Sequence, residues 1–296
     1  MHLGNARTAL LAWLDARARG GRVVLRIEDL DRDRCRPEFA DAIRADLRWL
    51  GLHWDEETAP QSRRDRAYRA AVEHLEAAGL VYECYCTRRE LAVASAPHGA
   101  GGDPPPYPGT CRTLTAERRE ELRREGRTPA LRVRMPDRLP DVDDRIHGRV
   151  PGGCGGDIVV RRTDGLYAYH LAVVVDDAAD GVTDVLRGDD LLPSTSRQVV
   201  LASMLELPVP AYAHVPLVVD ADGVRLAKRH ASLTIRALRE AGATPEALVG
   251  AMAVSAGIAD GRACRPRQLV DGFDIARIPS APWAPDEGAL VTAGRG

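Results

Sequence analysis

Three cysteines close together in the sequence could hold a metal ion. Cys84 and Cys86 are separated by one residue, and Cys111 follows in the same segment. Thiolate sulfur is a preferred ligand of structural zinc, which takes four ligands in a tetrahedron. Tyr107 or His98 could supply the fourth ligand, and reduced, partly buried thiols are the alternative interpretation. The spacing predicts a structural zinc site.

Two further segments could bind a nucleotide. His2-Leu3-Gly4-Asn5 stands where a helix is expected to begin, so a histidine and backbone N–H groups would face phosphate oxygens. Arg225-Leu226-Ala227-Lys228-Arg229 is a cationic loop, and Lys228 could stabilise charge on a pyrophosphate leaving group. Each motif is weak alone, because a surface histidine or a solvated basic turn would give the same pattern.

Apolar periodicity predicts the elements that would position these motifs. Asn5 is the expected N-cap of the first helix, and Ser62 with Asp65 the expected capping box of a later one. Helices are expected over residues 5–20, 37–50, 65–78 and 195–205 and beyond residue 232, and strand-like runs cover 23–27, 131–135, 158–161, 171–175 and 215–219.

The alternation of helices and strands predicts an α/β core with a parallel sheet, formed by residues 1–80 and 156–235. Residues 81–155 contain the clustered cysteines and a Pro- and Gly-rich stretch, which indicates an inserted subdomain. Residues 236–296 are expected to form a short helical tail. Parallel sheets bind ligands beyond the carboxyl ends of their strands, and Glu28 lies at such an end.

Composition excludes several classes of protein. The chain has 296 residues, 45% of them hydrophobic, which suffices for about two domains with a proper core. It has neither an apolar run of membrane-spanning length nor a signal-peptide pattern, so a cytoplasmic protein is expected. Six cysteines are too few for a disulfide scaffold in a chain this long. A net charge of −2 means that RNA would have to bind a local basic patch.

In combination and in order, these segments resemble a class I aminoacyl-tRNA synthetase. The segment from His2 to Asn5 corresponds to a first signature usually written His-Ile-Gly-His, and that from Arg225 to Arg229 to a second, Lys-Met-Ser-Lys-Ser. Within the class, the segments 26–31, 167–177 and 186–191 are similar to the glutamyl branch. The resemblance implies a Rossmann-like, nucleotide-binding core with a zinc-bearing insert and a short helical tail.

The tail after Arg229 is shorter than the helical anticodon-binding region of a discriminating glutamyl-tRNA synthetase. With its Cys-x-Cys and Tyr-x-x-x-Cys pattern, the chain is similar to the glutamyl-queuosine tRNA(Asp) synthetases, which are reduced to the catalytic domain. That family activates glutamate and attaches it to the queuosine base in the anticodon of tRNA(Asp). The resemblance therefore implies L-glutamate, ATP with Mg²⁺ and queuosine-carrying tRNA(Asp) as partners of a monomer. A truncated synthetase that charges tRNA(Glu) and an inactive tRNA-binding remnant are the alternatives.

The resemblance also implies roles for individual residues. In adenylate formation the glutamate carboxylate is itself the nucleophile, so catalysis consists of positioning and charge stabilisation without a general base. The implied glutamate-binding residues are Glu28, Tyr169 and Arg187. The implied ATP-binding residues are His2, Gly4, Asn5 and Lys228, and two of them, His2 and Lys228, are also expected to assist catalysis. The implied zinc ligands are Cys84, Cys86, Tyr107 and Cys111.

The sequence departs from the family pattern ahead of the first signature. In the family a short strand with an Arg-x-x-Pro-Ser segment precedes the histidine signature, whereas this sequence starts at Met1-His2. The sheet is therefore expected to lack its first strand, and the chain as written to be aggregation-prone and nearly inactive. Asn5 also replaces the second histidine of the first signature, and Ala227 replaces a common serine of the second.

Overall fold

The computed structural model describes residues 1–31, 35–87, 89–91, 107–220, 222–224, 233–286 and 290. The described helices are α1 (Leu3–Ala18), α2 (Pro37–Trp49), α3 (Asp65–Ala77), α5 (Ala116–Arg124), α6 (Tyr169–Ala179), α7 (Leu192–Met204), α8 (Ile235–Glu240) and α9 (Pro245–Ser255). The strands are β1 (Val24–Leu25), β2 (Glu56–Glu57), β3 (Val81–Cys84), β4 (Ala130–Val133), β5 (Val142–Asp144), β6 (Gly148–Val150), β7 (Ile158–Arg161), β8 (Asp184–Gly188) and β9 (Ala211–Val215).

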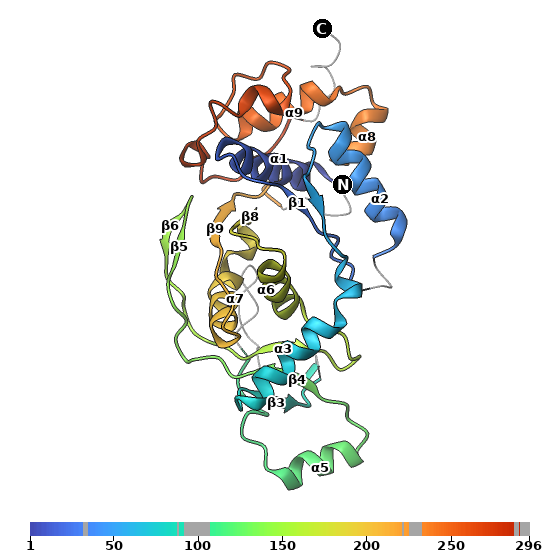
Figure 1. Ribbon diagram of the computed structural model, residues 1–296, viewed down its shortest axis with the longest axis vertical. Helices are drawn as coiled ribbons and strands as arrows, with labels where there is room; N and C mark the ends of the chain where they lie inside the picture. Colours follow the sequence, from blue (N-terminus) through green and yellow to red (C-terminus); the bar gives the residue numbers. More distant parts are fainter. Residues whose placement is uncertain are drawn as a thin grey trace.

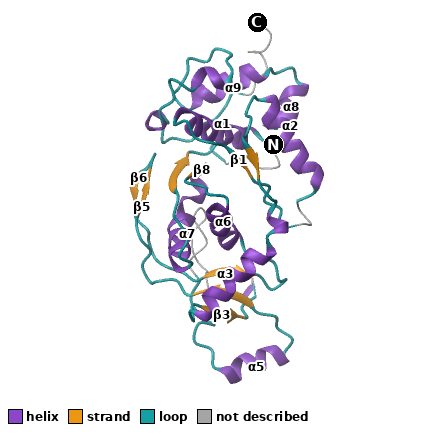
Figure 2. Ribbon diagram, in the orientation of Figure 1, coloured by secondary structure: helices purple, strands orange, loops and turns teal. Residues whose placement is uncertain are grey.

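The molecule is elongated. Figure 1 shows α1, α2, α8 and α9 at one end, α6 and α7 in the middle and α5 at the opposite end. Figure 2 shows the short strands β8, β5 and β6 beside the central helices, and β1 next to α1. Among the described residues, no helix combines the length and the apolar character needed to cross a membrane.

Parallel strands form the core expected from the sequence. Strand β9 runs parallel to both β5 and β8 in a sheet of order β6-β5-β9-β8, and β1 runs parallel to β2 in a second, two-stranded sheet. Helix α1 contacts β8, and its fully buried Leu10 and Leu14 belong to a core cluster shared with α8 and α9. This packing confirms the mixed α/β architecture with parallel strands.

A cavity of about 690 Å³ lies between β1, β8 and α1. Its lining includes Ala12 of α1, Val24 of β1 and Leu186 of β8. Both strands are at the edge of their sheets, since each has a single hydrogen-bonded neighbour. Arg19, at the end of α1, pairs with Asp184 at the start of β8. Residues of two edge strands and of one helix therefore line the same cavity.

A three-stranded antiparallel sheet, β3-β4-β7, lies between the central helices and α5. Val133 of β4 and Val160 of β7 are fully buried, and they share a core cluster with Tyr68 of α3, Leu171 of α6 and Leu201 of α7. Because α6 packs against both α3 and α7, this cluster fixes α6 in the middle of the molecule.

The helices expected near residues 5–20, 37–50, 65–78 and 195–205 are confirmed as α1, α2, α3 and α7, but residues 171–175 form part of α6 and not a strand. All five side chains from Leu171 to Val175 are buried. A helix that is apolar on every side lacks the polar stripe that distinguishes a helix from a buried strand in a sequence. The strand expected at 215–219 also lies earlier, as β9.

Both expected helix caps were wrong. Helix α1 has His2 as its N-cap, because the imidazole Nδ1 accepts a hydrogen bond from the backbone N–H of Asn5 (3.3 Å), which is already inside the helix. Helix α3 begins at Asp65 after a 3-10 turn, and Ser62 in that turn donates its hydroxyl to Asp29 (2.6 Å) instead of capping the helix. The cap of α1 is thus shifted from Asn5 to His2, whereas at α3 a contact with a side chain distant in sequence replaces the expected cap.

Candidate active site

The Arg187 side chain, near the end of β8, is held in one orientation by four side chains. It is only 9% exposed. Its Nη2 donates to Thr195 Oγ1 (2.8 Å) and Gln198 Oε1 (2.7 Å) on α7, and its Nη1 donates to the Tyr169 hydroxyl (3.4 Å). Its Nε donates to Nε2 of His214 on β9 (3.1 Å). The guanidinium therefore forms a fixed, buried wall of the site.

A buried histidine–carboxylate pair lies behind Arg187. His214 Nδ1 is 2.7 Å from Asp144 Oδ2, and both side chains are 0% exposed. Burial lowers the pKa of His214 although Asp144 acts to raise it. The pKa of Asp144 also lies below its ordinary value, because hydrogen bonds from His214 and from backbone N–H groups outweigh its burial. The pair is therefore a neutral imidazole that donates to a carboxylate.

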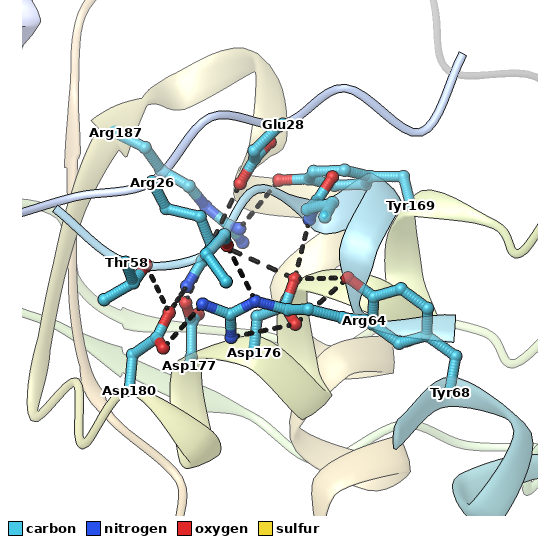
Figure 3. A network of polar contacts seen from close by, with 12 residues as sticks. Arg26, Glu28, Thr58, Arg64, Tyr68, Tyr169, Asp176, Asp177, Asp180 and Arg187 are labelled. Carbon is cyan, nitrogen blue, oxygen red and sulfur yellow. Dashed lines mark hydrogen bonds and ion pairs between the residues drawn. The ribbon is translucent and has the colours of Figure 1, made fainter. Parts of the chain in front are cut away.

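Glu28, three residues after the end of β1, lies beside Tyr169 and Arg187 (Figure 3). The Glu28 side chain is 42% exposed, and Tyr169 is 36% exposed. Burial raises the pKa of Glu28, and the Arg26 guanidinium, whose Nη2 donates to Glu28 Oε1 (3.4 Å), opposes that shift. The three residues predicted to hold glutamate thus lie together, offering a carboxylate, a phenol and a guanidinium.

A second group of charges fixes the chain around Glu28 (Figure 3). Arg26 Nη2 donates to Asp177 (2.6 Å) and Arg26 Nη1 to Asp180 (3.0 Å), which joins the end of β1 to α6. Arg64, just before α3, donates to the same Asp180 (2.7 Å). Because the arginines and the two carboxylates are mostly buried, these ion pairs are screened less than surface pairs. They hold β1, α3 and α6 in a fixed arrangement.

Asp176 completes this group from the interior of α6. It is 0% exposed, and its carboxylate accepts hydrogen bonds from Gln61 Nε2 (2.8 Å) and from the Tyr68 hydroxyl (2.8 Å). Breaking a buried pair by removing one partner costs about 3–5 kcal/mol. We therefore expect Asp176→Ala to lower the free energy of unfolding by several kcal/mol, measured by urea denaturation, whereas Asp164→Ala in an exposed turn leaves it within about 0.5 kcal/mol.

The start of α1 lines a separate cavity of about 340 Å³. His2, Gly4 and Asn5 lie on one side, and Gly188 and Asp190 on the other. A Cβ added at Gly4 would lie 3.2 Å from the His2 ring, and one at Gly188 only 2.6 Å from Asp190 Oδ1. Both glycines therefore keep this cavity open. Lys228 and His98, which the sequence also singled out, lie outside the described residues.

The predicted metal ligands lie together in the segment around β3. Tyr107 Oη is 3.4 Å from Cys84 Sγ and 3.6 Å from Cys86 Sγ, and Cys86 Sγ is 3.5 Å from Cys111 Sγ. The three sulfur atoms all lie within 4.8 Å of one another. Burial, reinforced by the neighbouring thiols, raises the pKa of the Cys86 thiol to about 12. Four ligand atoms thus surround one point.

The sequence matches the family model described as tRNA synthetases class I (E and Q), catalytic domain, over residues 1–287. The chain belongs to this family. It is an aminoacyl-tRNA ligase-type enzyme, and it is 53% identical over 294 residues to a Symbiobacterium thermophilum protein named glutamyl-Q tRNA(Asp) synthetase, covering 95% of this chain and 91% of that relative. A Nocardia farcinica protein of the same name is 52% identical over 292 residues, with 98% and 91% covered.

Relatives named for tRNA(Glu) charging are longer than this synthetase domain. A glutamate–tRNA ligase of Halorhodospira halophila is 44% identical over 300 residues, which cover 95% of this chain but 62% of the ligase. The crystal structure of a glutamate tRNA ligase from Elizabethkingia meningosepticum in complex with its amino acid matches with a TM-score of 0.81 and 28% identity, covering 98% of this chain and 65% of that one. The fold is therefore that of the shared catalytic domain.

Sequence reasoning missed four side chains of the candidate site: Thr195, Gln198, Asp144 and His214. Thr195 and Gln198 are three residues apart on α7, so a helical spacing could have indicated that they share a face. Asp144 and His214 are 70 positions apart and come together through the parallel pairing of β5 with β9. No local pattern in the sequence could have predicted that Asp144 and His214 are in contact.

Proposed function

We propose that this synthetase activates L-glutamate with ATP and transfers it to the queuosine base in the anticodon of tRNA(Asp). The observation that carries the proposal is that the Glu28 carboxylate lies near the Arg187 guanidinium, a combination that suits an amino acid carrying both an ammonium and carboxylates. The length shared with relatives named glutamyl-Q tRNA(Asp) synthetase favours this function over charging of tRNA(Glu). We place the reaction in the cytoplasm, with the protein acting as a monomer.

In the proposed reaction Glu28 pairs with the substrate ammonium, while Arg187 and Tyr169 bind a substrate carboxylate. The glutamate α-carboxylate attacks the α-phosphorus of ATP, giving glutamyl-adenylate and releasing pyrophosphate. The start of α1, with His2 and Gly4, binds the phosphates, and Mg²⁺ would bridge them when ATP is present.

Lys228 would stabilise charge on the pyrophosphate leaving group. In the second step an RNA hydroxyl attacks the acyl carbon, and AMP leaves with the bonding electrons and the hydroxyl proton. The first nucleophile is a carboxylate, and the second is an RNA hydroxyl that attacks an already activated acyl-adenylate. The contribution of the protein is therefore positioning and charge stabilisation.

The acceptor can be tested with tRNA that lacks its 3′-terminal CCA. We expect labelled glutamate to enter CCA-less tRNA(Asp) from cells that make queuosine, and not tRNA(Asp) from cells that do not. Transfer to tRNA(Glu) alone, abolished by loss of CCA, would identify a conventional glutamate–tRNA ligase. An absence of glutamate-dependent ATP–pyrophosphate exchange in a folded protein that retains its full active site would favour the inactive remnant.

We also propose that Cys84, Cys86, Tyr107 and Cys111 hold one structural zinc ion. A zinc ion with sulfur ligands at about 2.3 Å implies about 3.8 Å between ligand atoms at the corners of a tetrahedron. The separations of 3.4–3.6 Å in the Cys84–Tyr107, Cys86–Tyr107 and Cys86–Cys111 pairs fit such a site. A bound cation would also offset the cost of placing several ionised ligands in this buried position.

Purified protein is expected to contain one zinc per chain by elemental analysis, and Cys86→Ser to lower both zinc content and the melting temperature. Cys154→Ser, at an exposed cysteine, is the matched control and should change neither. Because the cluster is remote in sequence from Glu28 and Arg187 and is proposed to be structural, glutamate affinity should survive partial loss of zinc. Protein purified without chelator that holds no zinc and has all thiols free would contradict the proposal.

A further inference from the structure

We infer that His214 is a positioning residue that orients Arg187 toward the substrate, and that Asp144 selects the histidine tautomer able to do so. This inference rests on the proposed role of Arg187 in binding glutamate. The contacts that carry it are the Arg187 Nε to His214 Nε2 hydrogen bond (3.1 Å) and the contact of His214 Nδ1 with Asp144 Oδ2 (2.7 Å).

The direction of these hydrogen bonds follows from the groups involved. A guanidinium has donors only, so Nε2 of His214 must be the acceptor and carry no proton. The single proton of a neutral imidazole then sits on Nδ1, where it is donated to the Asp144 carboxylate, an acceptor. The hydrogen bonds that join Arg187, His214 and Asp144 can therefore all form only when the proton of His214 is on Nδ1.

Asp144 is itself fixed by the backbone. Its Oδ1 accepts from the N–H groups of Ile146 and His147, each at 2.9 Å, so Oδ2 is left to meet His214. The backbone of the tight turn after β5 therefore fixes the orientation of the Asp144 carboxylate.

The charged and titratable groups around His214 come from several elements. Arg187 lies on β8, Asp144 on β5, His147 in the turn after β5 and Asp189 directly after β8, while the Tyr212 ring stacks on the imidazole. With one arginine already in contact, a second positive charge on His214 would be unfavourable. The neutral histidine matches its surroundings.

Asp144→Asn tests the tautomer while changing little else. The amide oxygen can still accept from the two backbone N–H groups, but the amide nitrogen is a donor facing Nδ1. The histidine proton must then move to Nε2, which can donate it to the Thr195 hydroxyl (3.0 Å) but can no longer accept from the N–H of Arg187. Loss of this hydrogen bond to a charged group is expected to raise the KM for glutamate about 10-fold to 100-fold, with the KM for ATP unchanged.

Substitutions of His214 separate its two nitrogens. His214→Gln places an amide oxygen near the Nε2 position, so it should keep Arg187 oriented and raise the glutamate KM only slightly. His214→Asn keeps a donor toward Asp144 but offers Arg187 nothing, so it should resemble Asp144→Asn. In the double variant D144N/H214Q the tautomer no longer matters, and the glutamate KM should return to that of H214Q alone.

The readouts are the KM values for glutamate and ATP in ATP–pyrophosphate exchange, together with ¹⁵N NMR of labelled histidine. We expect the His214 proton on Nδ1 in the wild type and on Nε2 in D144N. A flipped proton in D144N with an unchanged glutamate KM would overturn the inference, as would equal losses in H214Q and H214N. If the proposed function itself is wrong, the wild type shows no glutamate-dependent exchange, while the tautomers remain measurable by NMR.

Discussion

Arg187→Ala is expected to weaken glutamate binding by on the order of a hundredfold or more, while ATP binding stays within about twofold. In the proposed complex the substrate carboxylate would lose a charged partner in a closed pocket, and such a loss costs several kcal/mol. ATP is proposed to bind at the start of α1, which lines a different cavity. Isothermal titration calorimetry with each ligand measures both affinities directly.

The control must account for the buried partners of Arg187. Its removal takes one hydrogen-bond partner from each of Thr195, Gln198 and His214, so some loss of stability is expected alongside the loss of affinity. Arg162→Ala removes an exposed arginine that pairs with Asp164 and should change neither affinity. Equal weakening of glutamate and ATP by Arg187→Ala would show that Arg187 serves the fold and not the ligand.

Periodicity predicted most helices correctly but failed where burial is complete. Helix α2 begins at Pro37 as expected, because its amphipathic pattern and the proline mark it in the sequence. For residues 171–175 of α6 the sequence pattern predicts a strand, and the structure shows a helix. A run in which every side chain is buried has no polar face, so the helical period of apolar and polar residues is missing from the sequence. The distinction between the two lies in tertiary packing and is absent from the local sequence.

Only those residues of the candidate site that lie in sequence motifs could be predicted. Glu28, Tyr169 and Arg187 lie in segments that resemble a known family, and the structure brings them together. The groups that hold them could not be found in that way. Asp144 meets His214 through strand pairing, and Arg26 meets Asp177 through the docking of α6, so both contacts depend on positions far apart in the chain.

Helix α6 connects two groups of the proposed glutamate site, the Tyr169 phenol and the Glu28 carboxylate. Its first residue is Tyr169, and two turns later Asp177 grips Arg26, two positions before Glu28. Asp180, at the end of the helix, grips the same arginine and Arg64. The positions of the Tyr169 phenol and of the Glu28 carboxylate therefore both depend on the same helix, and the spacing between these two groups is set by how α6 packs.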